Sequence, residues 1–197
     1  MEASDAFALR PPVTYRERSP GRTASRSSAF LISSKYYHLK MPELPEVEIT
    51  RQKLLPILRG RRILDFWTDW PRGLRTYEKR LISGSMKGRR ISDITRRGKI
   101  LFFKLSGQPP RSLAIHLRMS GRLEVRAIKT LSPSSHRWIH FRWRLSGGKE
   151  LCFIDPRKFG VVWYGSSDDF ENDPHLGRLG LDARLMSLEQ FLKIIKD

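Results

Sequence analysis

Residues 90–126 read RISDITRRGKILFFKLSGQPPRSLAIHLRMSGRLEVR, and this stretch decides the fold. Short runs rich in Ile, Leu, Phe and Val are punctuated by Gly and Pro, which is typical of strands joined by tight turns. We predict strands at 90–95, 100–105, 112–118 and 122–126. Turn signals separate them at Gly98, at residues 107–109 and at Gly121. This stretch therefore predicts a β-rich domain.

The same pattern continues on both sides of this stretch. It predicts four further strands, at 62–68, 138–145, 150–154 and 161–164. Eight short strands with hairpin spacing favour a β-sandwich or a barrel.

The single cysteine, Cys152, lies between Leu151 and Phe153, which predicts a buried thiol in a strand. One cysteine excludes a disulfide framework and any cysteine-rich zinc site within these residues.

Helices are predicted to flank the strands. The first should begin at Pro45, because proline suits a first turn, and end near Arg59 and Gly60. Its apolar stripe consists of Val47, Leu54, Leu55 and Leu58. Further along the chain we predict a second helix at 77–83, a polar loop at 166–174 and an amphipathic helix at 188–196 capped by Ser187.

The chain is strongly basic. It has 197 residues and a net charge of +18, and 39% of its residues are hydrophobic, which is enough for a core. Residues 1–40 hold 7 Lys and Arg and 3 Asp and Glu, so residues 41–197 keep 31 basic and 17 acidic residues, a net charge of +14. Such an excess favours a polyanionic partner, nucleic acid first, over the alternative of a merely solvated basic surface.

Residues 1–40 differ in composition from the rest. Five arginines between Arg10 and Arg26 are interleaved with Ser and Pro, and acidic residues are scarce. We expect a disordered extension, which is either a transit peptide or sequence upstream of a misassigned start. No stretch approaches the roughly 20 apolar residues of a transmembrane helix, so no membrane partner is expected.

Reactive chemistry is suggested by Met41-Pro42-Glu43-Leu44-Pro45-Glu46-Val47-Glu48. If translation starts at Met41 and the Met is removed, Pro42 presents a free secondary amine. An α-amino group titrates near neutrality, so much of it is unprotonated and nucleophilic at pH 7. Condensation with an aldehyde gives a positively charged iminium, with Glu43 and Glu46 near enough to handle protons. Inside a peptide bond the same nitrogen is an inert amide.

Three later segments add to this signal. Residues 96–99, Arg-Arg-Gly-Lys, form a basic hairpin tip, and residues 116–121, His-Leu-Arg-Met-Ser-Gly, end a strand at an exposed Met before a turn. Residues 155–160, Asp-Pro-Arg-Lys-Phe-Gly, form a loop with two cations and an aromatic ring. Such a loop suits insertion into a stacked duplex, with Phe as a wedge and Arg at the vacated base edges.

In this order, the four segments closely resemble the formamidopyrimidine-DNA glycosylase (Fpg, or MutM) family, relatives of endonuclease VIII. The resemblance covers about residues 41–185, and Leu44 fits the formamidopyrimidine branch. It implies a mostly β fold with flanking helices, an eight-stranded antiparallel β-sandwich of the family's N-terminal type. It also implies domains at 41–165 (catalytic), 166–185 (loop and hinge) and 186–197 (first helix of a truncated C-terminal domain).

The resemblance implies a bifunctional base-excision enzyme that removes oxidised purines such as 8-oxoguanine and formamidopyrimidines. The damaged base is flipped out of double-stranded DNA. Pro42 then attacks C1′ of the deoxyribose, and β- and δ-elimination cut the strand through a Schiff base. The matched roles are a general acid/base for Glu43, support for Glu46 and a phosphate contact for Lys99. Met119, Arg157 and Phe159 match the residues that fill the gap left by the extruded nucleotide.

Further DNA contacts are expected from His116, Arg137, His140 and Lys158. Trp138 stands where the family has one of its phosphate-contacting histidines. His136 and His140 lie four residues apart, but with no carboxylate or cysteine near them in sequence we expect no metal site. The family's four-cysteine zinc finger and its second DNA-binding half are absent from this sequence, so no cofactor is expected and activity should be impaired.

Two other functions stay open. One is a non-catalytic damaged-DNA-binding module from a truncated or split gene, in which Pro42 is never freed. The other is a basic β-domain that binds RNA or ribosomes. For the favoured enzyme we expect a monomer in the cytoplasm or nucleoid, or in an organelle if residues 1–40 are a transit peptide.

Overall fold

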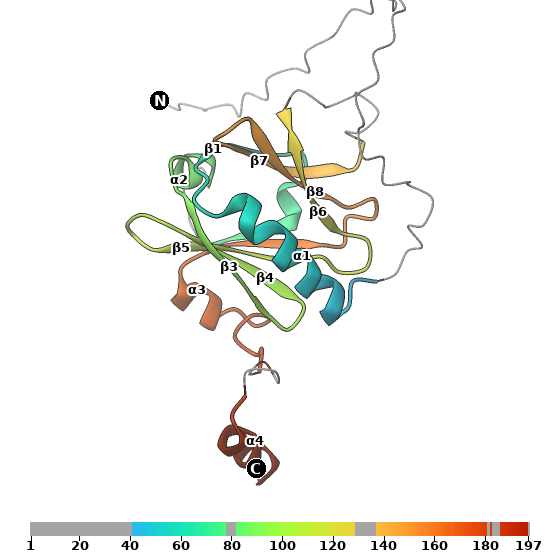
Figure 1. The fold of residues 1–197 in the computed structure, drawn as a ribbon, viewed down its shortest axis with the longest axis vertical. Coiled ribbons are helices and arrows are strands. Elements are labelled where there is room, and N and C mark those ends of the chain that lie inside the picture. The colour runs from blue at the N-terminus through green and yellow to red at the C-terminus, as the bar shows by residue number, and fades with distance from the viewer. Residues whose placement is uncertain (1–40, 78–81, 129–136, 181, 183–185, 197) are drawn as a thin grey trace, which may run out of the picture. The chain divides into compact units, whose positions relative to one another are not determined.

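The computed structural model describes residues 41–77, 82–128, 137–180, 182 and 186–196, and its chain path is shown in Figure 1. The expected disorder of residues 1–40 and the role of His136 lie outside the described residues. The helices are α1 (Leu44–Leu58), η2 (Pro71–Gly73), α2 (Ile82–Met86), α3 (Ser167–Glu171) and α4 (Leu188–Lys196). The strands are β1 (Ile63–Thr68), β2 (Leu74–Thr76), β3 (Ile91–Arg97), β4 (Ile100–Leu105), β5 (Arg111–His116), β6 (Arg122–Ala127), β7 (Ile139–Leu145), β8 (Lys149–Ile154) and β9 (Val161–Gly165).

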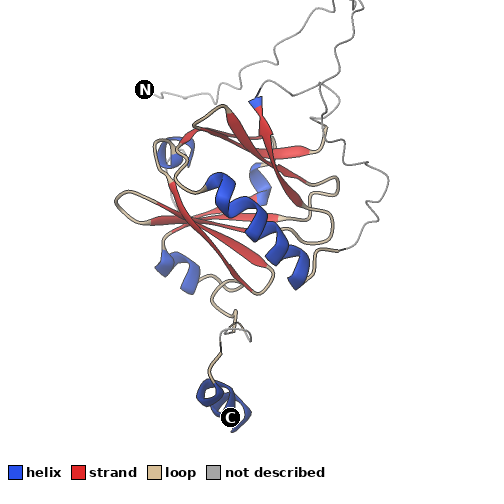
Figure 2. Ribbon diagram, viewed as in Figure 1, coloured by secondary structure: helices blue, strands red, loops and turns tan. Residues whose placement is uncertain are grey.

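Two sheets form the domain, which confirms the mostly β fold. One has the order β1-β7-β8-β6 and the other β2-β9-β5-β4-β3. Figure 2 shows both sheets in red, with α1 lying across them. Strand residues that point inward alternate along each strand, and they form one core with the apolar face of α1. The largest residues of this core include Trp143, Tyr164, Phe103, Phe141, Phe153 and Leu58.

All eight predicted strands are present, and the structure adds a ninth. Strand β2 has three residues and pairs in parallel with β9, beginning with Leu74 opposite Val162. The sandwich is therefore antiparallel except at this edge. Alternation over three residues is too short to be recognised in the sequence.

The helix predictions are partly wrong. Helix α1 begins at Leu44, one residue before the predicted start, and Gly60 follows it at φ +80°, a left-handed conformation that glycine adopts without strain. The described helix near the predicted 77–83 is α2, which runs three residues past the predicted end, to the fully buried Met86; residues 78–81 lie outside the described residues.

The polar segment 166–174, predicted as a loop, contains α3. Ser166 caps this helix, because its Oγ accepts the backbone N–H of Asp169 at 3.1 Å while its own N–H donates to the Asp169 carboxylate at 2.7 Å. Phe170 then packs with Trp163 and Ile100 on the outer face of the five-stranded sheet. The sequence carried this capping signal. The division into a catalytic domain, a hinge and a following domain stays a prediction.

Candidate active site

One end of α1 opens onto a pocket of about 530 Å³. The start of α1, the β3–β4 turn, the end of β5 and the loop after β8 all contribute to its wall. The lining residues are Met41, Pro42, Lys99, His116, Arg118, Met119, Lys158 and Phe159. Residues from all four sequence segments thus meet in one place, although up to 118 positions separate them along the chain.

The first residues of α1 hold two of the predicted carboxylates. Glu43 is the N-cap, and its backbone N–H donates to the Glu46 carboxylate at 3.1 Å. Glu46 therefore helps to cap the N-terminus of α1, where its negative charge also interacts favourably with the helix dipole. The Glu43 carboxylate lies 2.5 Å from Nζ of Lys99, and both side chains are about half exposed. In this chain Met41 precedes Pro42, so the Pro42 nitrogen is part of a peptide bond.

A buried ion-pair network centred on Glu48 holds the Lys99 turn against α1. Arg96 donates from Nε to the Glu48 carboxylate at 3.0 Å and from Nη1 to the carbonyl of Gly98 at 2.8 Å. Arg51 donates to the same carboxylate at 2.7 Å. The hydrogen bond from Arg51, and then that from Arg96, lower the pKa of Glu48 to about 2 despite its burial. Glu48 is therefore ionised at neutral pH and fixes the turn.

The same turn also contacts the segment that follows α3. Nη2 of Arg96 donates to the carboxylate of Asp182 at 2.5 Å. Arg97 donates to the carbonyls of Leu176 and Leu179 at 2.9 and 2.7 Å. Two adjacent arginines therefore fix the turn from both sides.

The end of β5 places a neutral histidine in the pocket wall. The backbone N–H of Arg118 donates to Nδ1 of His116 at 2.9 Å, so this nitrogen carries no proton. Burial, followed by the charges of Arg118 and Lys99, lowers the pKa of His116 to about 4. The strand ends two residues before the predicted boundary because Arg118 adopts φ +55°. Met119 then projects with 41% of its surface exposed.

The loop after β8 is organised by the carboxylate of Asp155, which is completely buried. It accepts the Ser120 hydroxyl at 2.5 Å and the backbone N–H groups of Arg157, Phe159 and Gly160 at 3.2, 2.8 and 2.7 Å. The guanidinium of Arg157 lies over the Phe159 ring, 4.3 Å from its centroid. Phe159 remains 45% exposed. The buried Asp155 carboxylate therefore holds a loop that carries the Arg157–Phe159 cation–π pair at the surface.

A sequence model of the formamidopyrimidine-DNA glycosylase N-terminal domain matches residues 41–162, more than half of the chain. The chain belongs to this family. Its relatives include the formamidopyrimidine-DNA glycosylases of Chloroflexus aurantiacus, 46% identical over 123 residues (62% of this chain and 42% of the relative), and of Magnetococcus marinus, 37% identical over 154 residues (75% and 52%). The chain thus spans about half the length of the curated relatives it matches.

Solved structures of Fpg match the same region. Lactococcus lactis Fpg bound to DNA with an abasic site is 29% identical, with a TM-score of 0.57 over 65% of this chain and 45% of that chain. A point mutant of the same enzyme, bound to DNA containing Fapy-dG, matches with the same values. The fold predicted from the resemblance is therefore shown.

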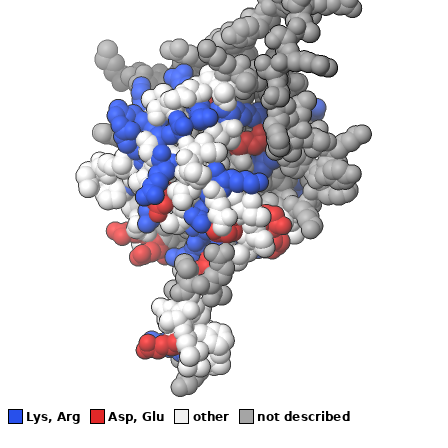
Figure 3. Space-filling model, in the orientation of Figure 1, with Lys and Arg blue, Asp and Glu red and all other residues white. Residues whose placement is uncertain are grey.

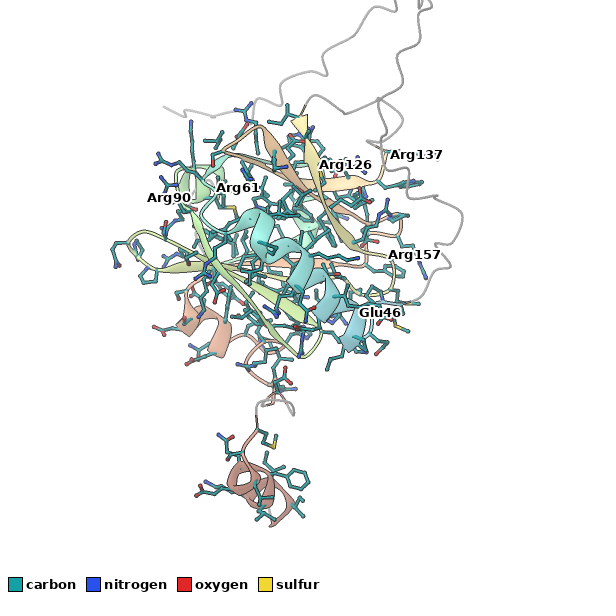
Figure 4. All side chains as sticks on the ribbon, in the orientation of Figure 1. Glu46, Arg61, Arg90, Arg126, Arg137 and Arg157 are labelled. Carbon is teal, nitrogen blue, oxygen red and sulfur yellow. The ribbon has the colours of Figure 1, made fainter. Side chains whose placement is uncertain are left out.

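Five residues that the Fpg resemblance nominated are not part of the pocket lining: Glu43, Glu46, Arg137, His140 and Arg157. His140 is 3% exposed, and its Nδ1 lies 2.8 Å from the Asp69 carboxylate; its role as a DNA contact stays a prediction. Arg137 lies over the ring of Trp138, 4.6 Å from its centroid, outside the pocket. Figure 4 shows Arg137 away from Glu46 and Arg157, which lie near the start of α1.

The sequence did not reveal the residues that hold the site together. The sequence predicts no role for Glu48 or for the Asp155 carboxylate, and none for Arg96 beyond its charge. The available signal for Asp155 was an aspartate at the start of a loop, since such side chains often accept the backbone N–H two residues on, as Asp155 does from Arg157. Among the described residues no group of three His, Cys, Asp or Glu side chains could hold a metal ion, and no helix is long and apolar enough to cross a membrane.

Proposed function

We propose that this chain carries the catalytic half of a bifunctional DNA glycosylase and AP lyase for oxidised purines in double-stranded DNA. The observation that supports it is the pocket that joins Pro42 and Lys99 to the exposed Met119 and Phe159. It unites a nucleophile position, a cation for phosphate and apolar side chains that can replace an extruded base. The family relatives support the coarser function, DNA repair by a glycosylase.

In the proposed reaction, the freed Pro42 nitrogen forms a bond to C1′ of the damaged nucleotide. The C1′–base bond breaks, and the base leaves with its electron pair and takes up a proton. The C1′–O4′ bond then breaks, with the amine proton lost and a proton taken up by O4′, so the sugar ring opens and an iminium forms between the Pro42 nitrogen and C1′. The iminium acidifies C2′, loss of a C2′ proton expels the 3′ phosphate, and a second elimination expels the 5′ phosphate. Glu43 is placed to move these protons and Lys99 to bind a phosphate. This chemistry needs no metal or cofactor, and we propose that a single protomer performs it.

Borohydride trapping on abasic duplex DNA tests this proposal. Borohydride reduces an iminium to a stable amine, so the chain beginning at Pro42 should become covalently joined to the DNA. The matched control is the chain that keeps residues 1–41, in which the Pro42 nitrogen is an amide and no adduct should form. If the chain that begins at Pro42 also gives no adduct, Pro42 is not the nucleophile of this protein.

One observation favours a second function, a non-catalytic module that binds damaged DNA. Met41 lines the same pocket as Pro42. In a chain that keeps residues 1–41 the pocket wall is therefore complete, but the Pro42 nitrogen is an amide and cannot react. The intact mass of the native protein separates the two functions, since a mass that begins at Pro42 supports the enzyme. A mass that includes Met41 supports the binding module.

A further inference from the structure

Two basic turns of nearly the same sequence lie side by side at the far end of α1. They are residues 59–62, Arg-Gly-Arg-Arg, and residues 87–90, Lys-Gly-Arg-Arg, and we call them the twin basic turns. Gly60 and Gly88 have φ +80° and +87°. The backbone N–H of Gly60 donates to the carbonyl of Ile91 at 2.7 Å, and the Ile91 N–H returns a bond to the first turn at 2.9 Å. The backbone therefore holds the two turns, which together carry six cations, next to each other.

Three of these cations are anchored to backbone carbonyls. Arg61 donates to the carbonyls of Ile57 and Ser146, and Arg90 donates to that of Gly60. Arg89 donates to the carbonyl of Ser85 in α2 and to two carbonyls of the β4–β5 loop. These bonds orient the guanidinium groups without cancelling their charge.

The other three cations, Arg59, Arg62 and Lys87, are exposed. Among the described residues, none of the six cations forms an ion pair with a carboxylate. In Figure 3, Lys and Arg side chains cover the part of this face where α2 and β1 lie in Figure 1, whereas most of the visible Asp and Glu side chains lie lower down. The surface is thus a concentration of uncompensated positive charge.

The twin basic turns are separate from the pocket. Helix α1 has 15 residues, from Leu44 beside the pocket to Leu58 beside the first turn. At 1.5 Å per residue, about 22 Å of helix lies between the two sites. Figure 4 shows Arg61 and Arg90 at one end of α1 and Glu46 and Arg157 at the other. The charges therefore serve neither Pro42 nor a nucleotide in its pocket.

We propose that the twin basic turns form a second phosphate-binding surface, which holds the backbone of undamaged double-stranded DNA. Five of the six cations are arginines, whose planar fork of donors matches phosphate oxygens. Neither turn contains an aromatic residue on which an unpaired base could stack, so a duplex is favoured over a single strand. Binding to this surface should depend neither on the base sequence of the DNA nor on a lesion in it, and it should not require a free Pro42 amine.

The test uses the full chain with Arg59→Gln, Arg62→Gln and Lys87→Gln combined. These side chains make no hydrogen bond to the described part of the chain, and the anchored arginines stay in place. The control variant combines Arg72→Gln, Lys104→Gln and Arg178→Gln, which are exposed, lie outside the twin basic turns and lower the net charge equally. Binding of an undamaged 30-base-pair duplex is followed by fluorescence anisotropy from 50 to 200 mM salt.

Each phosphate contact contributes about 0.9 to the slope of log affinity against log salt, so three lost contacts should reduce the slope by about 2.7. Over this salt range the wild type would lose about 40-fold more affinity than the twin-turn variant. The control should keep most of the wild-type slope. Equal slopes for the two variants would overturn the proposal, because net charge alone would then explain binding.

Two further measurements sharpen the test. Duplex RNA bound with the same affinity and slope as duplex DNA would overturn the assignment to DNA. The triple variant made on the chain beginning at Pro42 should still be trapped by borohydride at saturating abasic DNA, because the pocket is unchanged. Loss of trapping at saturation would show that the two sites are not separate. Failure of Pro42 to react in either background would leave the salt-dependence result unaffected.

Discussion

Replacing Glu48 by Gln is expected to destabilise the protein by about 3 kcal/mol at pH 7. The Glu48 carboxylate is 6% exposed and accepts hydrogen bonds from Arg51, Gln52 and Arg96. Its pKa falls from 4.5 to about 2, chiefly because of Arg51. One pKa unit corresponds to about 1.4 kcal/mol, so the folded state favours the ionised form by about 3 kcal/mol.

The pH dependence of this effect has a definite sign. Because the folded pKa of Glu48 lies below the unfolded one, its contribution is fully present above about pH 4.5. It is lost as the pH falls from about 4.5 to about 2. The difference in unfolding free energy between wild type and Glu48→Gln should therefore be constant from pH 7 to 5 and should shrink at pH 4 and 3.

Urea unfolding at pH 7, 5, 4 and 3 measures this difference. The matched control is Glu171→Gln, which removes an exposed carboxylate and should change stability by less than about 0.5 kcal/mol at each pH. A cost below about 1 kcal/mol for Glu48→Gln at pH 7 would refute the reasoning. So would a cost that stays the same down to pH 3, because the loss would then come from packing and not from charge.

Three further predictions concern the pocket and its supports. Asp155→Ala should cost about 3 kcal/mol or more in urea unfolding and weaken duplex binding in anisotropy, because several buried donors lose their acceptor; unchanged stability would contradict this. In an NMR titration the ring of His116 should protonate near pH 4, with stability falling as the pH drops from 6.5 toward 4, whereas a midpoint near 6.5 would show that the ring is not buried. Gly160→Ala places a Cβ 2.3 Å from the Phe153 ring and should lower the melting temperature by several degrees, while Gly84→Ala, which meets nothing within 4 Å, should leave it unchanged or raise it.

The strands were predictable because each is a local signal. Alternation and a turn residue at each end locate β3 to β6 without knowledge of their partners. The exceptions depend on partners that are distant in sequence. Strand β2 exists because Leu74 lies opposite Val162, and α2 extends past its predicted end because Met86 packs in the core. Neither contact can be read from the neighbouring residues.

The pocket followed from motifs, but its supports did not. Pro42, Lys99, Met119 and Phe159 were nominated from four short segments, and the structure brings them together. His140 was nominated in the same way, yet its side chain lies in the interior. A motif specifies which residue types are present, whereas the direction of a side chain depends on sheet register. At β7 the register shifts between Ile139 and Phe141, the position of this histidine.

The arrangement around α1 also bears on what freeing Pro42 would do. A free nitrogen at Pro42 would stand two residues before the helix, next to the Glu43–Lys99 ion pair. The positive end of the helix and Lys99 both disfavour a protonated amine, while the Glu43 carboxylate favours one. Because Glu48 and Arg96 hold the turn in place, Lys99 cannot readily move away from the new group. The network therefore keeps Lys99 in the same pocket as Pro42, so removal of Arg96 should change the pH dependence of trapping more than the position of Pro42.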